Sequence, residues 1–221
     1  MRPTRTRIKI CGLREPGHAR IAAESGADAI GLVFYPPSPR YVTVDQAIEV
    51  TDALPPFVTA VGLFVNETRE AIESILDRVP LDLLQFQGDE TPDFCAGFGK
   101  PFVRAVRMEE GVDLVEWASR FSAARALLLD AHVQGERGGT GQAFDWARIP
   151  GEWARRPHGA PLPLILSGGL TAQNVERAVR EVRPWAVDVS SGVESTRGVK
   201  DPALIVEFIR SVQREDAGRD A

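Results

Sequence analysis

Several features that mark particular classes of protein are scarce in this sequence. Its 221 residues include two cysteines, Cys11 and Cys95, and three histidines. The two cysteines could form a disulfide, but a reducing compartment and a chain large enough to fold without one favour free thiols. The histidines show no ligand spacing with the cysteines, so we expect no structural metal. No stretch approaches the ~20 apolar residues of a membrane-spanning helix, and none has the form of an export signal. The sequence therefore favours a cytoplasmic protein with no membrane partner.

An excess of basic charge is also absent. Lysine and arginine number 26 against 31 aspartates and glutamates, which gives a net charge of −5 and a pI of about 5.3. Without a basic field, nucleic acid is not an expected partner. The chain does have 43% hydrophobic residues, enough for one sizeable core, and no low-complexity linker divides it. We expect a single domain over residues 1–213 and a charged, frayed tail over residues 214–221.

Short apolar runs alternate with segments of helical periodicity along the chain. The pattern predicts strands at residues 7–11, 29–35, 58–65, 81–85, 102–106, 126–130, 163–166 and 186–189. It predicts helices at residues 16–25, 43–54, 66–79, 112–121, 145–154, 171–182 and 202–212, with Asn66 and Thr171 as N-caps. Eight such units favour an α/β fold with a closed barrel of parallel strands, the (β/α)8 TIM barrel. The alternative, an open doubly wound sheet, carries its glycine fingerprint after the first strand.

The last two strands each stop at a turn rich in glycine and serine. Residues 163–166 lead into Ser167-Gly-Gly169, and residues 186–189 lead into Ser190-Ser-Gly192. Such turns present backbone N–H groups to a phosphate dianion, and the phosphate site of an eight-stranded barrel lies after strands seven and eight. Either turn alone is also compatible with an ordinary strand–helix connection. As a pair, they predict phosphate binding by Gly168, Gly169, Ser190, Ser191 and Gly192.

Few side chains at the strand ends are suited to chemistry. Asp130 closes an apolar strand, where a carboxyl either carries a proton or caps loop amides. Cys11 ends the first strand and is either a base, if positive charge lowers its pKa, or a small core residue. Strand parity does not favour Lys9 as the source of that charge. Arg40, in a proline-stiffened loop, either clamps a planar carboxylate or lies solvated at the surface.

The longest irregular stretch follows the sixth strand and contains Gly138-Gly-Thr-Gly141. Its glycines allow the loop to close over a ligand, and Gly141 could add a backbone N–H to the phosphate site. A merely flexible loop is the alternative. His132 lies in the same stretch, but no nucleophile with an elbow-type turn accompanies it, so a catalytic triad is not predicted.

Taken together, these motifs resemble the phosphoribosylanthranilate isomerase family of tryptophan biosynthesis. The resemblance covers nearly the whole chain. The motifs that carry it are Lys9-Ile-Cys-Gly-Leu13, Gly26-Ala-Asp-Ala-Ile-Gly-Leu-Val-Phe34, Ser38-Pro-Arg40, Val61-Gly-Leu-Phe-Val-Asn66, Leu84-Gln-Phe-Gln-Gly88, Leu128-Leu-Asp130, Gly138-Gly-Thr-Gly141, Phe144-Asp-Trp146, Ser167-Gly-Gly-Leu170 and Asp188-Val-Ser-Ser-Gly-Val-Glu194. Related ribose-phosphate barrels share only the phosphate-binding half.

The resemblance implies a ribulose-phosphate-binding barrel that catalyses the Amadori rearrangement of N-(5'-phosphoribosyl)anthranilate. It assigns Asp130 as the general acid, Cys11 as the general base and Arg40 as the ligand of the anthranilate carboxylate. The predicted phosphate-binding turns keep their assignment. No metal or organic cofactor is implied. The expected partner is a small phosphorylated substrate, and the protein is expected to be a monomer or a homodimer. Gln87 departs from the family, which usually has histidine at this position.

Two other functions stay open from the sequence. One is another ribose-phosphate barrel, such as the histidine-pathway isomerase, which performs the same rearrangement on a larger substrate. In that family the base on the first strand resembles an aspartate, so Cys11 counts against it. The other is a non-catalytic barrel that only binds a sugar phosphate, which predicts a damaged acid or base, whereas Cys11 and Asp130 are both present.

Overall fold

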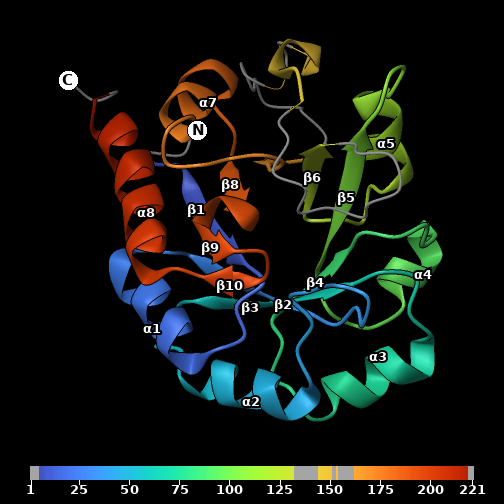
Figure 1. The fold of residues 1–221 in the computed structure, drawn as a ribbon. Helices are drawn as coiled ribbons and strands as arrows, with labels where there is room; N and C mark the ends of the chain where they lie inside the picture. Colours follow the sequence, from blue (N-terminus) through green and yellow to red (C-terminus); the bar gives the residue numbers. More distant parts are fainter. Residues whose placement is uncertain (1–4, 132–143, 151–152, 154–161, 219–221) are drawn as a thin grey trace.

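A computed structural model describes residues 5–131, 144–150, 153 and 162–218 (Figure 1). Eight parallel strands close into a barrel in chain order, and β1 pairs with both β2 and β8. The barrel strands are β1 (Arg7–Cys11), β2 (Ala29–Val33), β3 (Thr59–Phe64), β4 (Leu83–Phe86), β5 (Phe102–Met108), β6 (Ala126–Ala131), β7 (Leu164–Leu166) and β8 (Ala186–Val189). The predicted (β/α)8 barrel is confirmed.

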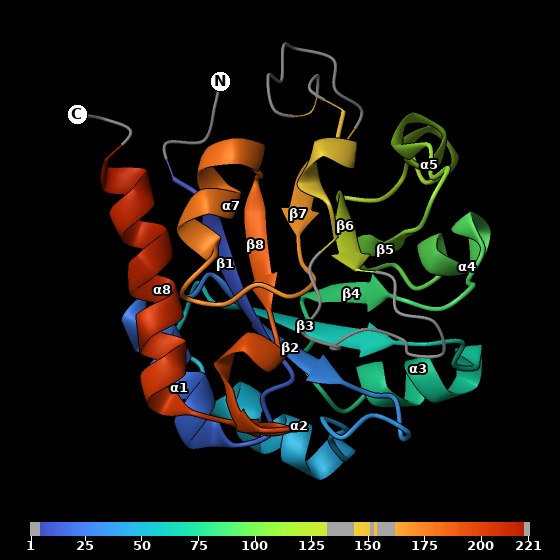
Figure 2. The ribbon, with the colours of Figure 1, turned by 45° about the horizontal axis from the view of Figure 1, so that its top comes forward.

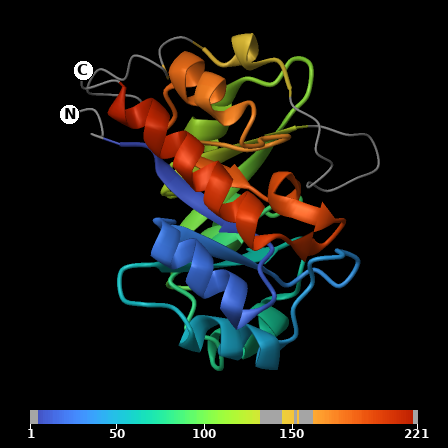
Figure 3. The same ribbon diagram turned by 60° about the vertical axis from the view of Figure 1, so that its left-hand side comes forward.

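Helices cover the outside of the barrel (Figure 2). They are α1 (Pro16–Ser25), α2 (Val44–Asp52), α3 (Arg69–Leu76), α4 (Pro92–Ala96), α5 (Leu114–Arg120), α7 (Val175–Val182) and α8 (Pro202–Ala217), with 3-10 turns η1 (Trp146–Arg148) and η2 (Ser191–Val193). The long helix α8 packs against both α1 and α7 and so closes the outer layer where the first and last strands meet (Figure 3). In the described part of the chain, no helix is both long and apolar enough to cross a membrane.

Part of the barrel interior is filled by apolar side chains, because strand residues alternate between the inside and the helix-facing side. One interior cluster joins Val103, Ala105, Ala126 and Leu128 from β5 and β6. A second joins Cys11, Val33, Leu63 and Val65, at or just beyond the C-terminal ends of β1, β2 and β3. This second cluster provides an apolar surface at the C-terminal ends of the barrel strands.

Two of the predicted N-caps are wrong. Helix α3 begins after Thr68, whose hydroxyl accepts a hydrogen bond from the amide of Ala71, while Asn66 adopts a left-handed backbone with φ of 52°. Helix α7 begins after Asn174, not at Thr171. The Asn174 side chain instead accepts from the Thr171 amide at 2.9 Å and donates to the Gly169 carbonyl at 2.8 Å. The Asn66 side chain likewise binds a loop residue, accepting from the amide of Asp89 and donating to Asp89 Oδ2 at 3.0 Å.

The C-terminal boundary also differs from the prediction. Helix α8 extends through Ala217, so residues 214–217 are helical and not a frayed tail. The cause is Asp216, which is buried and accepts hydrogen bonds from the amide and hydroxyl of Thr6, at 2.6 and 2.9 Å. A charged residue near a chain end is therefore held by a partner 210 positions away.

Four short elements, α4, η1, β9 and β10, were missed or misjudged. Helix α4 was not predicted, and within the segment predicted as a helix at residues 145–154 the structure has the 3-10 turn η1, with residues 151, 152 and 154 outside the described residues. An antiparallel hairpin of β9 (Glu194–Thr196) and β10 (Val199–Lys200) follows η2 and was also not predicted. Elements this short carry too few residues for a clear periodicity.

Candidate active site

A pocket opens at the C-terminal ends of the barrel strands. Its lining includes Cys11 from β1, Arg40 from the loop after β2, Asp130 from β6, and residues of the two turns after β7 and β8. The turn residues that line it are Ser167, Gly168, Gly169, Ser190 and Ser191. Side chains and turns predicted from distant parts of the sequence therefore meet in one cavity. Gly141 lies outside the described residues.

Asp130 is a buried carboxyl with both oxygens engaged. Its Oδ2 accepts from Gln87 Nε2 at 2.9 Å, and its Oδ1 accepts from the amide of Ala131 at 3.0 Å. Burial and the negative charge of Asp188 raise the pKa of Asp130 to about 6, although both hydrogen bonds oppose the rise. The carboxyl can therefore carry a proton close to neutral pH, as a general acid requires.

Cys11 is a buried thiol that borders the pocket and has space because β2 carries a glycine beside it. Gly31 is its register partner, and a Cβ on Gly31 would lie 2.7 Å from Sγ. Burial raises the pKa of Cys11, the charges of Lys9 and Lys200 lower it, and the charge of Asp188 raises it further. Strand parity did not favour Lys9 as the source of this charge, yet its charge and its hydrogen bond both lower the pKa of the Cys11 thiol, because its long side chain brings the ammonium within range.

A buried ion pair lies in the barrel interior. Lys9 Nζ and Asp188 Oδ1 are 2.8 Å apart, with side chains 7% and 5% exposed, and Ser167 Oγ donates to the other Asp188 oxygen at 3.3 Å. The sequence analysis missed this pair. A signal existed, because each residue is a charge between apolar neighbours inside a strand. The structure shows the two to be register partners across β1 and β8. A charge buried in a strand is costly unless a charge of opposite sign pairs with it.

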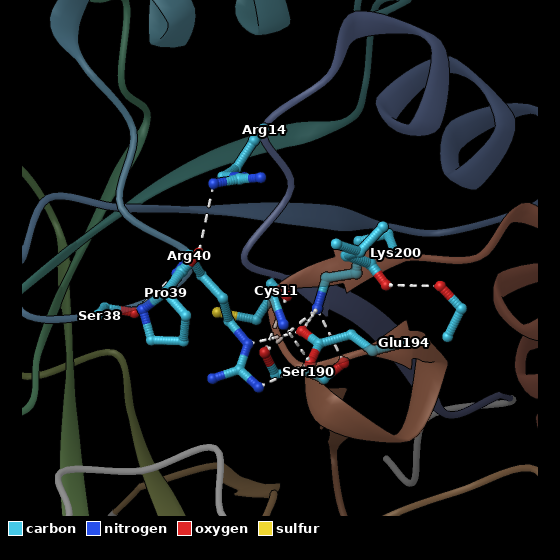
Figure 4. A network of polar contacts seen from close by, with 11 residues as sticks. Cys11, Arg14, Ser38, Pro39, Arg40, Ser190, Glu194 and Lys200 are labelled. Atoms are coloured by element: carbon cyan, nitrogen blue, oxygen red, sulfur yellow. Dashed lines mark hydrogen bonds and ion pairs between the residues drawn. The ribbon is translucent and has the colours of Figure 1, made fainter.

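Arg40 is buried rather than solvated (Figure 4). Its Nε and Nη2 donate to the two carboxylate oxygens of Glu194 at 2.6 and 2.9 Å. Gly12, with φ of 78°, lies under its aliphatic chain, since a Cβ there would be 2.6 Å from Cδ of Arg40. Burial raises the pKa of Glu194, but hydrogen bonds and charge from Arg40 and Lys200 outweigh it and lower the pKa to about 2. Glu194 is therefore ionised throughout the neutral range.

The two turns predicted to bind phosphate lie against each other. Gly168 and Gly169 both have left-handed backbones, with φ of 82° and 64°, which favours glycine. A Cβ on Gly192 would collide with the carbonyl of Leu170, so the absent side chain lets the second turn pack on the first. Gly192 lies behind the pocket wall, whereas Gly168, Gly169, Ser190 and Ser191 line it.

The arrangement suits proton transfer on an anionic substrate. A carboxyl with a raised pKa and a thiol border the same cavity, beside a guanidinium and two glycine- and serine-rich turns. Within the described ranges, no group of three or more His, Cys, Asp or Glu side chains is placed to hold a metal ion.

Comparison with known proteins agrees with these features. The family model of N-(5'phosphoribosyl)anthranilate (PRA) isomerase matches residues 8–211. The N-(5'-phosphoribosyl)anthranilate isomerase of Ralstonia nicotianae is 54% identical over 223 residues, which cover 98% of this chain and 96% of the relative. The crystal structure of phosphoribosyl anthranilate isomerase from Thermotoga maritima has a TM-score of 0.83 at 37% identity and covers 95% of this chain and 99% of that one.

A further solved structure is that of phosphoribosyl anthranilate isomerase in complex with reduced 1-(o-carboxyphenylamino)-1-deoxyribulose 5-phosphate. It has a TM-score of 0.80 at 37% identity, with coverage of 95% of this chain and 99% of that one. The family model spans most of the chain, and the relatives match it over nearly its full length. The chain therefore belongs to the N-(5'-phosphoribosyl)anthranilate isomerase family of tryptophan biosynthesis.

Proposed function

We propose that this chain converts N-(5'-phosphoribosyl)anthranilate into 1-(2-carboxyphenylamino)-1-deoxyribulose 5-phosphate with Asp130 as general acid and Cys11 as general base. The observation that carries the proposal is that both side chains line one pocket, together with Arg40 and the turns after β7 and β8. A single barrel supplies all of these groups, so the proposal holds for a monomer or a homodimer.

The first step is opening of the sugar ring. Asp130 donates its proton to the furanose oxygen as the C1–O bond breaks, and the anilino nitrogen supplies the electron pair that forms a protonated Schiff base. A pKa of about 6 leaves a useful fraction of Asp130 protonated while keeping it a strong enough acid. After the step, the carboxylate is held by Gln87 and the amide of Ala131.

The second step is removal of a proton from carbon. The Cys11 thiolate takes the C2 proton, and the electron pair moves into the protonated imine to give an enolamine, which tautomerises to the ketone. The imine nitrogen of the substrate is the electron sink, so the proposal includes no cofactor. Lys9 and Lys200 favour the thiolate by placing positive charge near Cys11.

The order of the two pKa values decides which form of the protein reacts. Asp130 must be protonated and Cys11 ionised, yet the pKa of Asp130 is about 6 and burial raises that of Cys11. The reactive form is then a minority of the protein. Its fraction rises with pH up to the pKa of Asp130, stays level between the two pKa values, and falls above the pKa of Cys11. The lower break in kcat/KM therefore belongs to Asp130, near pH 6.

Each part of the substrate is assigned to a different group of pocket residues. Val33, Leu63 and Val65 provide an apolar surface for the anthranilate ring, next to Arg40 for its carboxylate. Gly168, Gly169, Ser190 and Ser191 line the part assigned to the phosphate. We expect the reduced carboxyphenylamino-deoxyribulose phosphate bound by the related enzyme to bind here as well.

A fluorescence assay with freshly prepared phosphoribosylanthranilate tests the activity, because the anthranilate emission changes as the sugar rearranges. We expect turnover by the natural chain, and at least ~10²-fold lower kcat in Asp130→Asn and in Cys11→Ala with binding of the reduced analogue largely kept. No turnover by the natural chain would reject the function. Near-normal kcat in both variants would reject the assignment of acid and base.

A further inference from the structure

A buried chain of polar contacts connects Arg40 to the turn after β8 (Figure 4). Glu194 accepts from Arg40 and from Lys200 Nζ, the latter at 2.8 Å. Lys200 Nζ also donates to the carbonyl of Ser190 at 2.8 Å, and Ser190 Oγ donates to the carbonyl of Cys11 at 3.1 Å. The side chains of Arg40, Glu194 and Lys200 are 7%, 4% and 2% exposed. The contacts thus run from the proposed carboxylate ligand to the backbone of the proposed base.

The β9–β10 hairpin makes this chain of contacts possible. Lys200 returns opposite Glu194 in the hairpin register, and the amide of Gly198 donates to Glu194 Oε2 at 3.0 Å. Gly198 has φ of 85°, and a Cβ there would lie 2.7 Å from the carbonyl of Pro39, next to Arg40. The hairpin is therefore packed closely onto the loop after β2, and Glu194 accepts hydrogen bonds from three residues, Arg40, Lys200 and Gly198.

We propose that Glu194 and Lys200 are positioning residues, which hold the Arg40 guanidinium and the Ser190 turn in fixed relation to Cys11. The inference rests on the proposed function, in which Arg40 binds the anthranilate carboxylate. Glu194 engages the edge of the guanidinium formed by Nε and Nη2. A guanidinium has the planar fork geometry that binds a carboxylate through two parallel hydrogen bonds, and these contacts with Glu194 set its direction.

The cost of burying these charges supports a positioning role. Taking an ion pair out of water is expensive, and well-packed apolar side chains of the same volume often give equal or greater stability. A triad of Arg40, Glu194 and Lys200 is therefore a poor way to stabilise a fold. It is a good way to fix the direction of a guanidinium, because each donor and acceptor has a required geometry.

The triad also acts on the proposed base. Its charges sum to one positive, with Lys200 close enough to lower the pKa of Cys11. The other charged groups that face Cys11 are Lys9 from β1, which lowers its pKa, and Asp188 from β8, which raises it. Neutralising Glu194 leaves two cations and should lower the pKa of Cys11. Neutralising Lys200 should raise it.

The test uses the variants Glu194→Gln and Lys200→Met in the full chain. In Glu194→Gln we expect KM for phosphoribosylanthranilate, and Kd for the reduced analogue, to rise about tenfold or more with a smaller change in kcat. The pH at which iodoacetamide alkylates Cys11 half-maximally should fall in Glu194→Gln and rise in Lys200→Met. Cys95→Ala is the common background for alkylation, so that only Cys11 reacts.

The double variant and two controls separate positioning from simple loss of structure. The double variant Glu194→Gln with Lys200→Met should return the Cys11 titration towards that of the natural chain, because the two changes of charge cancel. Its Kd for the reduced analogue should stay high, because the geometry of the triad is not restored. Compared with Lys200→Met, Lys200→Arg should restore part of the binding of the reduced analogue. Glu73→Gln, which removes an exposed partner of Arg69 at 3.4 Å, should change nothing.

Unchanged Kd in Glu194→Gln, or alkylation profiles that shift in the same direction in the two single variants, would overturn the inference. If Glu194→Gln fails to fold, Glu194→Asp replaces it. A Kd for the reduced analogue equal to that of the natural chain in Glu194→Asp would then overturn the inference. Analogue binding and alkylation need no turnover. Failure of the natural chain to turn over substrate therefore rejects the proposed function separately.

Discussion

Gln87 donates a hydrogen bond from Nε2 to Oδ2 of Asp130 at 2.9 Å, and Gln85 Nε2 donates in turn to Gln87 Oε1 at 3.0 Å. The second bond gives the Gln87 amide a fixed orientation, with its N–H group towards the carboxyl. In this chain, a side-chain amide thus contacts the proposed acid.

The variant Gln87→Leu should raise the pKa of Asp130 above about 6. The hydrogen bond favours the carboxylate, so losing it favours the protonated form. The lower break in kcat/KM against pH should move upwards, while Gln87→His, which retains a donor, should keep the break close to that of the natural chain. An unmoved break in Gln87→Leu would show that Gln87 does not tune the acid.

The raised pKa of Asp130 also predicts a dependence of stability on pH. The pKa rises from 3.8 to about 6 on folding, so between these values the folded state holds more protons than the unfolded state. Stability should therefore fall as pH rises from about 4 to about 6, by about 3 kcal/mol at most. Asp130→Asn cannot titrate and should lack this loss. Urea unfolding of both proteins across this range measures the difference, and parallel curves would contradict it.

The variant Gly31→Ala should impair catalysis from a position that contacts no substrate in the proposal. Its new methyl group would lie 2.7 Å from Sγ and 3.1 Å from Cα of Cys11, so the thiol must shift. We expect kcat to fall about tenfold or more, with a stability cost of about 1–3 kcal/mol. Steady-state kinetics and thermal unfolding measure the two effects.

Gly17→Ala is the matched control, because a Cβ at Gly17 meets no atom within 4 Å. It lies inside α1, where alanine is favoured over glycine by roughly 0.5–1 kcal/mol. It should keep kcat and slightly raise stability. Equal kcat in Gly31→Ala and Gly17→Ala would show that the thiol tolerates displacement.

Local sequence was sufficient for the eight barrel strands and for several helices of this protein. The strand from Arg7 to Cys11 and the helix from Pro16 to Ser25 were predicted at the bounds observed. Both follow from apolar periodicity and from a glycine, Gly26, that ends the helix in a left-handed conformation. The hairpin of β9 and β10 was missed because its strands are two and three residues long.

The site residues were predictable where the residue type and its place at a strand end both suggested chemistry. Cys11, Asp130 and Arg40, with the glycine and serine turns, were selected in this way, and all of them line the pocket except Gly192, which packs behind it, and Gly141, which lies outside the described residues. Their catalytic and binding roles stay proposals. The hydrogen-bond partners of these residues were not predictable, namely Gln87, which donates to Asp130, and Glu194, which accepts from Arg40.

The sequence by itself determined the barrel, because hydrophobic alternation and turn residues act over a few neighbouring positions. It also determined which side chains end the strands. Only the closed tertiary structure decided which charges are buried together, since Lys9 and Asp188 are 179 positions apart and meet only when β1 pairs with β8. The pKa values of Asp130 and Cys11 follow from that closure, because desolvation and Coulomb interactions depend on distance in space and not on distance along the chain.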